Sequence, residues 1–181
     1  DALNIRGGIS RVSQSRFYGN RDAIDLDLCQ ATIQNNIIYN NKDDGLDLGS
    51  AGPITVVRNI ISKSGDKGIS VGEQSQLKSY SNLLIDNNFA IAIKDGSSAF
   101  FEGDALVRNN IGLATYIKTG DGKHHIVVKG NGLLFDNKMD YKFDKNDTNS
   151  SKVEKQLSFS KRKINELNNY LAKPVYKQSH E

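Results

Sequence analysis

The chain has 181 residues, of which 24 are Lys or Arg and 21 are Asp or Glu, so its formal net charge is +3. Residues 1–150 hold 17 basic and 18 acidic side chains, whereas residues 151–181 hold 7 and 3, so the basic excess belongs to the C-terminal segment. Because this distribution gives no general case for nucleic-acid binding and no apolar run reaches 18 residues, we expect neither a nucleic-acid partner nor insertion into a membrane.

A short unit recurs along residues 2–115, made of a small residue, an apolar residue, any residue and a second apolar residue. Its copies are separated by 21, 22, 23, 22 and 22 residues and begin at Ala2, Ala23, Gly45, Gly68, Ala90 and, in a degenerate form, Gly112. A period of this length is typical of solenoid proteins, in which each repeat contacts its neighbours. The alternation of apolar residues within a copy, as in Leu3 and Ile5, predicts a β-strand.

Two further short apolar runs follow the unit in each repeat. The second runs include residues 9–12, 31–33 and 54–56, and the third runs include residues 37–38, 60–61, 83–84 and 133–134. Three short strands in each repeat fit one coil of a three-sided β-helix, whereas two helices with their turns need a longer repeat. We therefore predict an all-β fold, a right-handed parallel β-helix solenoid of about six to seven coils.

Polar residues recur with the same period beside the third runs. One column precedes these runs and a second follows five residues later: Ser15, Asn36, Asn59, Asn82, Asp104 and Asn131, then Asn20, Asn41, Ser64, Asn87, Asn109 and Asp136. Like residues in stacked coils lie about 4.8 Å apart, so their side-chain amides can form hydrogen bonds along the axis. Asn also tolerates the left-handed backbone of sharp corners, so we expect these residues to be structural.

The pattern changes after residue 143, where a polar linker is expected up to residue 152. Ser160 is expected to cap a helix over residues 161–172, and the apolar stripe of this segment is formed by Leu157, Ile164, Leu167 and Leu171. We therefore divide the chain into a β-helix over residues 1–143 and a tail over residues 144–181 that packs on the solenoid or caps its open end.

The repeats resemble the right-handed parallel β-helix superfamily, the pectate-lyase-like fold, over residues 1 to about 143. We expect a secreted or cell-surface domain with a polysaccharide as its partner. No cap comparable to the tail precedes Asp1, so an upstream domain or a partner is also expected at the N-terminal coil. This architecture hosts several chemistries and purely structural roles, so function has to be sought where the repeat is broken.

The outward-facing positions of the first strands break the repeat, because they are acidic in the second and third coils. Asp25 and Asp47, bordered by Arg6 and Lys94, are the expected polysaccharide-binding residues. Stacked carboxylates repel one another unless a proton, a cation or a basic side chain intervenes, so Asp25, Asp27 and Asp47 are also a candidate Ca²⁺ site. We expect no required cofactor. The alternative to a polysaccharide or Ca²⁺ site is a solvated aspartate cluster without function.

Three segments on consecutive coils resemble the Asn-x-Asp, Asp-Asp and Gly-His-Gly signatures of the polygalacturonase family of glycoside hydrolases, and they are residues 20–25, 43–46 and 66–72. The resemblance implies three carboxylates that activate water and protonate the leaving oxygen, namely Asp22, Asp43 and Asp44. Lys67 stands at the position of the family histidine and is taken as the fourth catalytic candidate. The family's Arg-x-Lys element is reduced to residues 92–94.

Other functions remain open alongside the expected polysaccharide-binding extracellular domain with an Asp-rich face. Besides hydrolysis, a polysaccharide lyase or epimerase acting on an acidic polysaccharide would use Lys67, Lys94 or Arg6 to abstract a proton or neutralise charge. A structural solenoid module of a larger surface protein would present a flat face with no groove.

Overall fold

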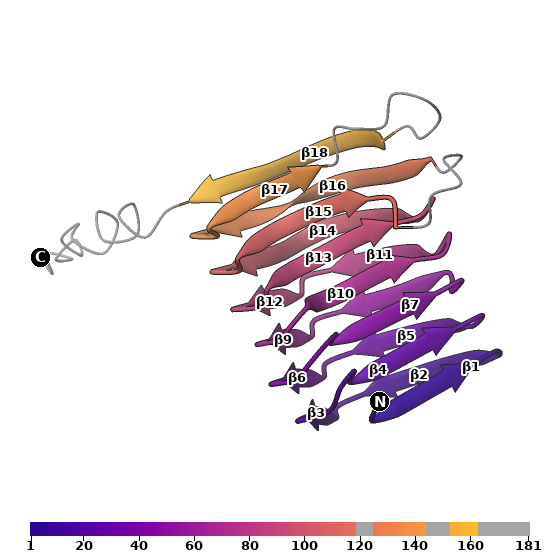
Figure 1. The fold of residues 1–181 in the computed structure, drawn as a ribbon. Coiled ribbons are helices and arrows are strands. Elements are labelled where there is room, and N and C mark those ends of the chain that lie inside the picture. Colours follow the sequence, from indigo (N-terminus) through magenta and orange to yellow (C-terminus); the bar gives the residue numbers. More distant parts are fainter. Residues whose placement is uncertain (119–124, 144–152, 163–181) are drawn as a thin grey trace, which may run out of the picture.

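The computed structural model describes residues 1–118, 125–143 and 153–162, which contain eighteen strands and no helix (Figure 1). Strands stack in parallel, each one paired with its counterpart in the next coil. The all-β parallel solenoid predicted from the repeat is therefore confirmed. No helix within the described ranges is long and apolar enough to cross a bilayer.

The first strand of every coil contributes to one seven-stranded sheet, which we call face 1. In spatial order its strands are β1 (Leu3–Arg6), β4 (Ile24–Asp27), β7 (Leu46–Gly49), β10 (Lys67–Gly72), β13 (Phe89–Lys94), β15 (Ile111–Tyr116) and β17 (Met139–Phe143). The repeated units lie in this sheet in register, so Ile24 pairs with Leu3 on one side and with Leu46 on the other. Ile24 and Leu46 are fully buried while Asp25 and Asp47 remain partly exposed, so the outward columns are those that the sequence predicts.

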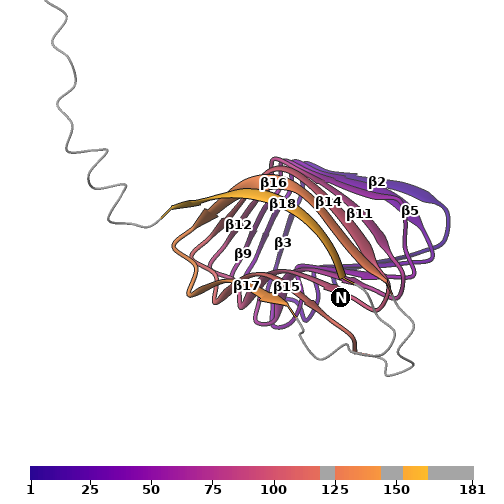
Figure 2. The same cartoon turned by 90° about the horizontal axis from the view of Figure 1, so that it is seen from above.

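The remaining strands form an eleven-stranded sheet that wraps around the other two sides of the coil (Figure 2). Face 2 contains β2 (Ile9–Ser13), β5 (Gln30–Gln34), β8 (Ile54–Val57) and β11 (Gln76–Tyr80). Face 3 contains β3 (Arg16–Tyr18), β6 (Ile37–Tyr39), β9 (Ile60–Ser62) and β12 (Leu83–Ile85). The longer strands β14 (Ser98–Val107) and β16 (Ile126–Phe135) contribute to both faces, and their register shifts between Glu102 and Asp104.

The last described strand, β18 (Val153–Arg162), pairs in parallel with β16 along its whole length. Ser160 and Lys161 lie in this strand, so the predicted cap and the start of the predicted helix are wrong. Leu157 and Phe159 pack partly buried against the core while Ser158 and Ser160 are exposed, and this alternation is that of a strand. Residues 144–152 and the remainder of the predicted helix lie outside the described residues.

Apolar columns run through the interior from coil to coil. The column of face 1 has no exposed surface and consists of Ile24, Leu46, Ile69, Ile91 and Leu113. Because parallel coils place like residues above one another, each of these side chains packs on its own counterpart, and full burial stabilises each by about 1.5–3 kcal/mol.

Two ladders of buried polar residues flank face 3. In the first ladder, a backbone N–H donates at 2.8–3.0 Å to the side-chain oxygen one coil later, through the pairs Ser15–Asn36, Asn36–Asn59, Asn59–Asn82 and Asn82–Asp104. The second ladder repeats this at 2.9–3.1 Å through Asn20–Asn41, Ser64–Asn87, Asn87–Asn109 and Asn109–Asn137. The structural role predicted for these columns is confirmed along these pairs.

Two details of the ladders differ from the prediction. Asn137, and not Asp136, receives the bond from Asn109, and Asn131 is exposed and accepts a bond from Gly103 at 3.3 Å. The left-handed residues are the neighbours that precede the ladder residues, with φ values between 52° and 58° at Asn35, Arg58 and Ser81 beside the first ladder and at Asn40, Lys63 and Asp86 beside the second. A left-handed non-glycine residue costs about 1–2 kcal/mol, so the ladder bonds have to offset these corners.

We expect Asn59→Ala to lower the free energy of unfolding by about 3 kcal/mol. The Asn59 side chain accepts the Asn36 N–H and donates to the carbonyls of Ile33 and Val57, all in buried or part-buried surroundings. Urea unfolding measures the change, and Asn110→Ala is the control because its amide bonds at the surface. Equal effects of the two substitutions would contradict a stabilising role of the ladder.

Candidate functional site

The acidic residues of the second and third coils gather at two adjoining places on the outer side of face 1. The corner cluster lies where the chain enters this face and consists of Arg21, Asp22, Asp43, Asp44, Asp66 and Lys67. The acidic depression lies further along the strands and is lined by Asp25, Asp27, Asp47, Leu48, Gly49, Gly72, Glu73, Lys94, Asp95 and Lys118.

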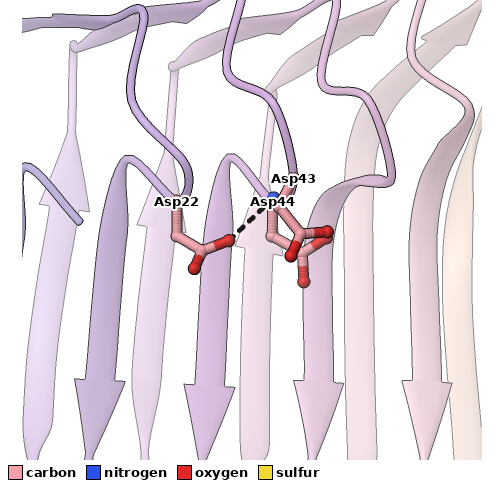
Figure 3. Close-up of side chains that lie close together, drawn as sticks. All are labelled: Asp22, Asp43 and Asp44. Atoms are coloured by element: carbon pink, nitrogen blue, oxygen red, sulfur yellow. Dashed lines mark hydrogen bonds between the residues drawn. The ribbon is translucent and has the colours of Figure 1, made fainter.

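Three carboxylates converge in the corner cluster (Figure 3). Asp22 precedes β4, while Asp43 and Asp44 precede β7 one coil later, and one oxygen of each lies within 4.8 Å of the others. Within the part of the chain that the structure describes, this is the group of three acidic residues that approach closely enough to hold a metal ion. The polygalacturonase-like residues predicted from the sequence are thus brought together.

Asp22 and Asp44 also form a short ladder of their own. Oδ1 of Asp22 accepts the backbone N–H of Asp44 at 2.9 Å, and Oδ1 of Asp44 accepts the backbone N–H of Lys67 at 2.8 Å. These bonds run in the opposite direction to the asparagine ladders, because here the side chain of one coil accepts from the backbone of the next. Both residues are at most 5% exposed, so each carboxylate fixes the coil register with one oxygen and has its second oxygen left for other partners.

Basic side chains partly neutralise the corner cluster. Oδ2 of Asp22 accepts bonds from Nε and Nη2 of Arg21 at 3.1 and 3.0 Å. The ammonium of Lys67 lies 3.5 Å from Oδ1 of Asp44 and in direct contact with the carboxylate of Asp66. Lys67 thus forms an ion pair with Asp44, one of the three aspartates of the predicted triad.

The protonation of Asp44 and Lys67 reflects this burial. Burial raises the pKa of Asp44 from 3.8 to about 6, although the Lys67 ammonium opposes the change. Burial lowers the pKa of Lys67, but the hydrogen bond to Asp66 and the carboxylate of Asp44 outweigh it, so the pKa is raised overall. Asp44 therefore exchanges a proton near neutral pH, as a general acid requires.

The acidic depression has a volume of about 270 Å³ and is shaped by two glycines. A Cβ on Gly49 would overlap the carboxylate of Asp27, and a Cβ on Gly72 would lie 3.3 Å from Cε and 3.6 Å from Nζ of Lys94. The side chains of Asp27 and Lys94 consequently fold over the glycines of the neighbouring coils.

The pKa values of two side chains that line the depression, Asp25 and Lys94, are also shifted. Burial raises the pKa of Asp25, and the nearby carboxylates of Asp27 and Asp47 add to this. Burial lowers the pKa of Lys94, which is 7% exposed, although Asp47 opposes the change. Oδ2 of Asp25 accepts a bond from Nδ2 of Asn4 at 2.7 Å. The depression thus holds partly desolvated charges of both signs.

The structure distributes the predicted binding and metal residues unevenly. Asp25, Asp27, Asp47 and Lys94 line one depression, whereas Arg6 is exposed on the edge strand β1, opposite Asp27 in register, and does not line it. The described carboxylates that converge most closely belong to the corner cluster and not to the predicted Ca²⁺ ligands.

Other residues of the site were missed by the sequence prediction. Glu73, Asp95 and Lys118 line the depression, and the backbone N–H of Lys118 donates to Oδ1 of Asp95 at 2.6 Å. Glu73 and Asp95 are the corner residues directly after β10 and β13, with φ values of 54° and 50°. Their spacing of 22 residues was the signal that could have identified them.

Comparison with known proteins identifies the family of this chain. A family model described as a right-handed beta helix region matches residues 1–147. The chain belongs to the right-handed β-helix family. No curated protein gives a significant match.

Two solved structures resemble this β-helix protein. The crystal structure of the periplasmic alginate epimerase AlgG matches with a TM-score of 0.53 and 18% identity, over 87% of this chain and 44% of the epimerase. A mutant of the same epimerase matches with a TM-score of 0.51 and 16% identity over the same shares of the two chains. At this identity the likeness shows a common fold, and this chain spans less than half the length of these neighbours.

We expect Asp44→Asn to change how stability depends on pH. With a pKa of about 6 in the folded chain against an ordinary 3.8, Asp44 binds its proton more tightly when folded. Its contribution to stability is therefore complete below about pH 4 and is lost as the pH rises through 6. Asparagine keeps the acceptor for the Lys67 N–H but does not titrate, so the stability of the variant relative to the wild type should rise by roughly 1–3 kcal/mol between pH 4 and pH 7.

Urea unfolding at several pH values in this range measures the difference. Glu102→Gln, which removes an exposed carboxylate from β14, controls for the loss of one negative charge. Parallel stability curves for wild type and Asp44→Asn would contradict the assignment.

Proposed function

We propose that this β-helix protein binds a polysaccharide along the outer side of face 1 and works outside the cytoplasm, either secreted or at the cell surface. The observation that carries the proposal is the acidic depression, because a purely structural module would present a flat face. Its volume of about 270 Å³ lies near the lower end of small-molecule sites, which suits one sugar unit of a chain that continues along the face.

The lining chemistry supports sugar binding. Carboxylates accept hydrogen bonds from hydroxyl groups, and ammonium groups donate to them, so Asp47, Glu73 and Lys94 offer both kinds of contact. Charged partners give stronger hydrogen bonds than neutral ones in partly desolvated surroundings. The two structural neighbours are a periplasmic alginate epimerase and its mutant, and they support both the class of ligand and the location.

The net negative charge of the depression favours neutral or amino-sugar polysaccharides over negatively charged ones. Five carboxylates face two ammonium groups among the lining residues. A neutral or amino-sugar polymer meets no net repulsion there, whereas a polyuronate requires a cation or protonated carboxylates. Ca²⁺ is therefore proposed as an optional bridging ion for acidic polymers and not as a required cofactor.

The corner cluster is the group best suited to such a cation. Ca²⁺ takes six to eight oxygen ligands, and the converging carboxylates of Asp22, Asp43 and Asp44 supply some of them. One oxygen each of Asp22 and Asp44 is already engaged by a backbone N–H, and the second oxygen of Asp22 is bound to Arg21. Cation binding would therefore have to compete with Arg21.

We expect Lys94→Ala and Gly72→Val to weaken polysaccharide binding by about 10-fold or more. The first substitution removes a hydrogen-bond donor from the depression. The second adds a side chain at the floor of the depression, where it pushes against the Lys94 side chain above Gly72 without changing the charge. Calorimetric titration with neutral, amino-sugar and uronate oligosaccharides, with and without Ca²⁺, measures the affinity.

Lys78→Ala is the matched control, since it removes an exposed lysine from face 2 and leaves the depression intact. Wild-type protein that binds no oligosaccharide of the panel would refute the proposal. Equal losses in Lys94→Ala and Lys78→Ala would exclude the depression as the binding site.

A second candidate function, hydrolysis of the bound polysaccharide, is favoured by the corner cluster. Asp44 with its raised pKa would protonate the leaving oxygen, and the half-buried Asp43 would activate water or attack the sugar. Retaining glycosidases hold their two carboxyl groups about 5–5.5 Å apart, and inverting ones about 6.5–9.5 Å, so close carboxylates suit this chemistry. One oxygen each of Asp22, Asp43 and Asp44 lies within 4.8 Å of the other two, which is nearer to the retaining separation than to the inverting one.

If hydrolysis occurs, Asp43→Asn should lower the release of reducing ends by at least about 100-fold while oligosaccharide binding persists. Asp43 takes no part in the ladder formed by Asp22 and Asp44, so its loss separates chemistry from folding. Detection of unsaturated products by their ultraviolet absorbance distinguishes a lyase from a hydrolase. Activity that survives Asp43→Asn unchanged would remove the corner cluster from the reaction.

A further inference from the structure

The acidic depression contains three charged side chains whose partners the chain does not supply. Asp27, Asp47 and Lys94 line it, and within the described residues none of these side chains forms a hydrogen bond or an ion pair. Arg6 faces Asp27 in register but makes no ion pair with it. Lys94 is only 7% exposed, and an ammonium group buried without a partner is costly because nothing replaces its contacts with water. The three side chains therefore point to a ligand that provides their partners.

The other carboxylates of the depression are engaged by the chain itself. Each accepts a hydrogen bond from a neighbouring coil, at 2.7, 3.3 and 2.6 Å, through the pairs Asp25 with Asn4, Glu73 with Ser50 and Asp95 with Lys118. A ligand therefore finds two carboxylates and one ammonium group that are not yet paired.

Opposite charges lean toward each other over two glycines. Gly49 of β7 and Gly72 of β10 pair in register, so they lie about 4.8 Å apart. The carboxylate of Asp27 reaches from the coil before and lies over Gly49, whereas the side chain of Lys94 reaches back from the coil after and lies over Gly72. The depression thus has a negative side and a positive side on adjacent coils, and the two sides do not neutralise each other through an ion pair.

Both sides of the depression gain from a charged ligand group more than from a hydroxyl group. Burial lowers the pKa of Lys94, so an anion beside it stabilises the charged form. The stacked carboxylates of Asp27 and Asp47 both raise the pKa of Asp25, so a cation among them relieves their repulsion. Hydroxyl groups make hydrogen bonds with either side but leave the charges uncompensated, and charge-assisted hydrogen bonds are about twice as strong as neutral ones.

We propose that the depression selects a zwitterionic segment of polysaccharide, with an amino-sugar ammonium group at Asp27 and Asp47 and a carboxylate at Lys94. This inference rests on the proposed binding of a polysaccharide along face 1 and names the charge pattern of that ligand. The volume of about 270 Å³ holds about one sugar unit, so the two charged groups belong to the same unit or to adjacent units. Because the negative side lies toward the N-terminal coils, the ligand also binds in one direction along the solenoid axis.

The first test is calorimetric titration of the wild type with oligosaccharides of equal length, at low and at high salt. An oligomer that alternates glucuronate with glucosamine should bind about 10-fold tighter than oligomers of glucosamine alone or of galacturonate alone, and salt should reduce this preference. Its N-acetylated form is the matched control, because it lacks only the ammonium charge, and it should bind about 10-fold more weakly. If a uniform oligomer binds as tightly as the alternating one, the charge pattern is wrong while the proposed function stands; if no oligosaccharide binds, both fail.

The second test removes one charge at a time with Asp27→Asn and Lys94→Met, which nearly keep the size of each side chain. Asp27→Asn should lower the ratio of affinities for glucosamine over galacturonate oligomers by about 10-fold, and Lys94→Met should raise it by about as much. Both substitutions should abolish the preference for the alternating oligomer.

Glu102→Gln is the control for the loss of a distant charge, since Glu102 is exposed on β14 and does not line the depression. It should leave the ratio and the preference unchanged. Circular dichroism checks that all variants keep the fold, as expected because the side chains of Asp27 and Lys94 hold no hydrogen bond within the described residues. A preference for the alternating oligomer that survives Asp27→Asn or Lys94→Met in a folded variant would overturn the inference.

Discussion

The register between successive coils is the constraint on which the rest of this protein depends. Each strand pairs with the same strand of the next coil, so every position in a coil meets its counterpart about 4.8 Å away. Apolar residues tolerate this stacking and form the core. The corners of the coil are energetically unfavourable, because left-handed residues such as Arg58 cost free energy. Hydrogen bonds of the buried amides beside them, such as that between Asn59 and Asn82, offset this cost.

The same register creates the electrostatics of face 1. The pKa values of Asp25 and Asp44 rise mainly because these carboxylates are buried. Neighbouring carboxylates add to the rise, since the backbone hydrogen bonds between strands prevent them from moving apart. Asp22 and Asp44 additionally hold the register with one oxygen each. Asp22 and Asp44 thus combine a structural role with a proposed chemical one, so substitution of Asp44 tests stability. Asp43 has no such bond in the ladder, so its substitution tests the chemistry.

The fold and the columns could be predicted because the period alone determines which residues lie side by side. Asp22, Asp43 and Asp44 were identified through the resemblance of their segments to a known family, and the structure brings these three residues together. The depression could not be predicted, since it depends on how Asp27 and Lys94 fold over Gly49 and Gly72. The strand β18 was missed because Leu157 fits both a helical stripe and the two-residue alternation with Phe159. A pattern of spacing assigns residues to a face but does not set the rotamers that shape its surface.

The corner between faces 2 and 3 always contains two residues where it joins separate strands, as between Ser13 and Arg16 or between Tyr80 and Leu83. The length of the corner between faces 1 and 2 varies more, from two residues after Arg6 and three after Gly72 to nine after Tyr116. Insertions are therefore accommodated next to Lys118, at the rim of the acidic depression, without displacing a ladder. A solenoid of this kind can alter the walls of its binding surface while the repeating frame beneath them stays unchanged.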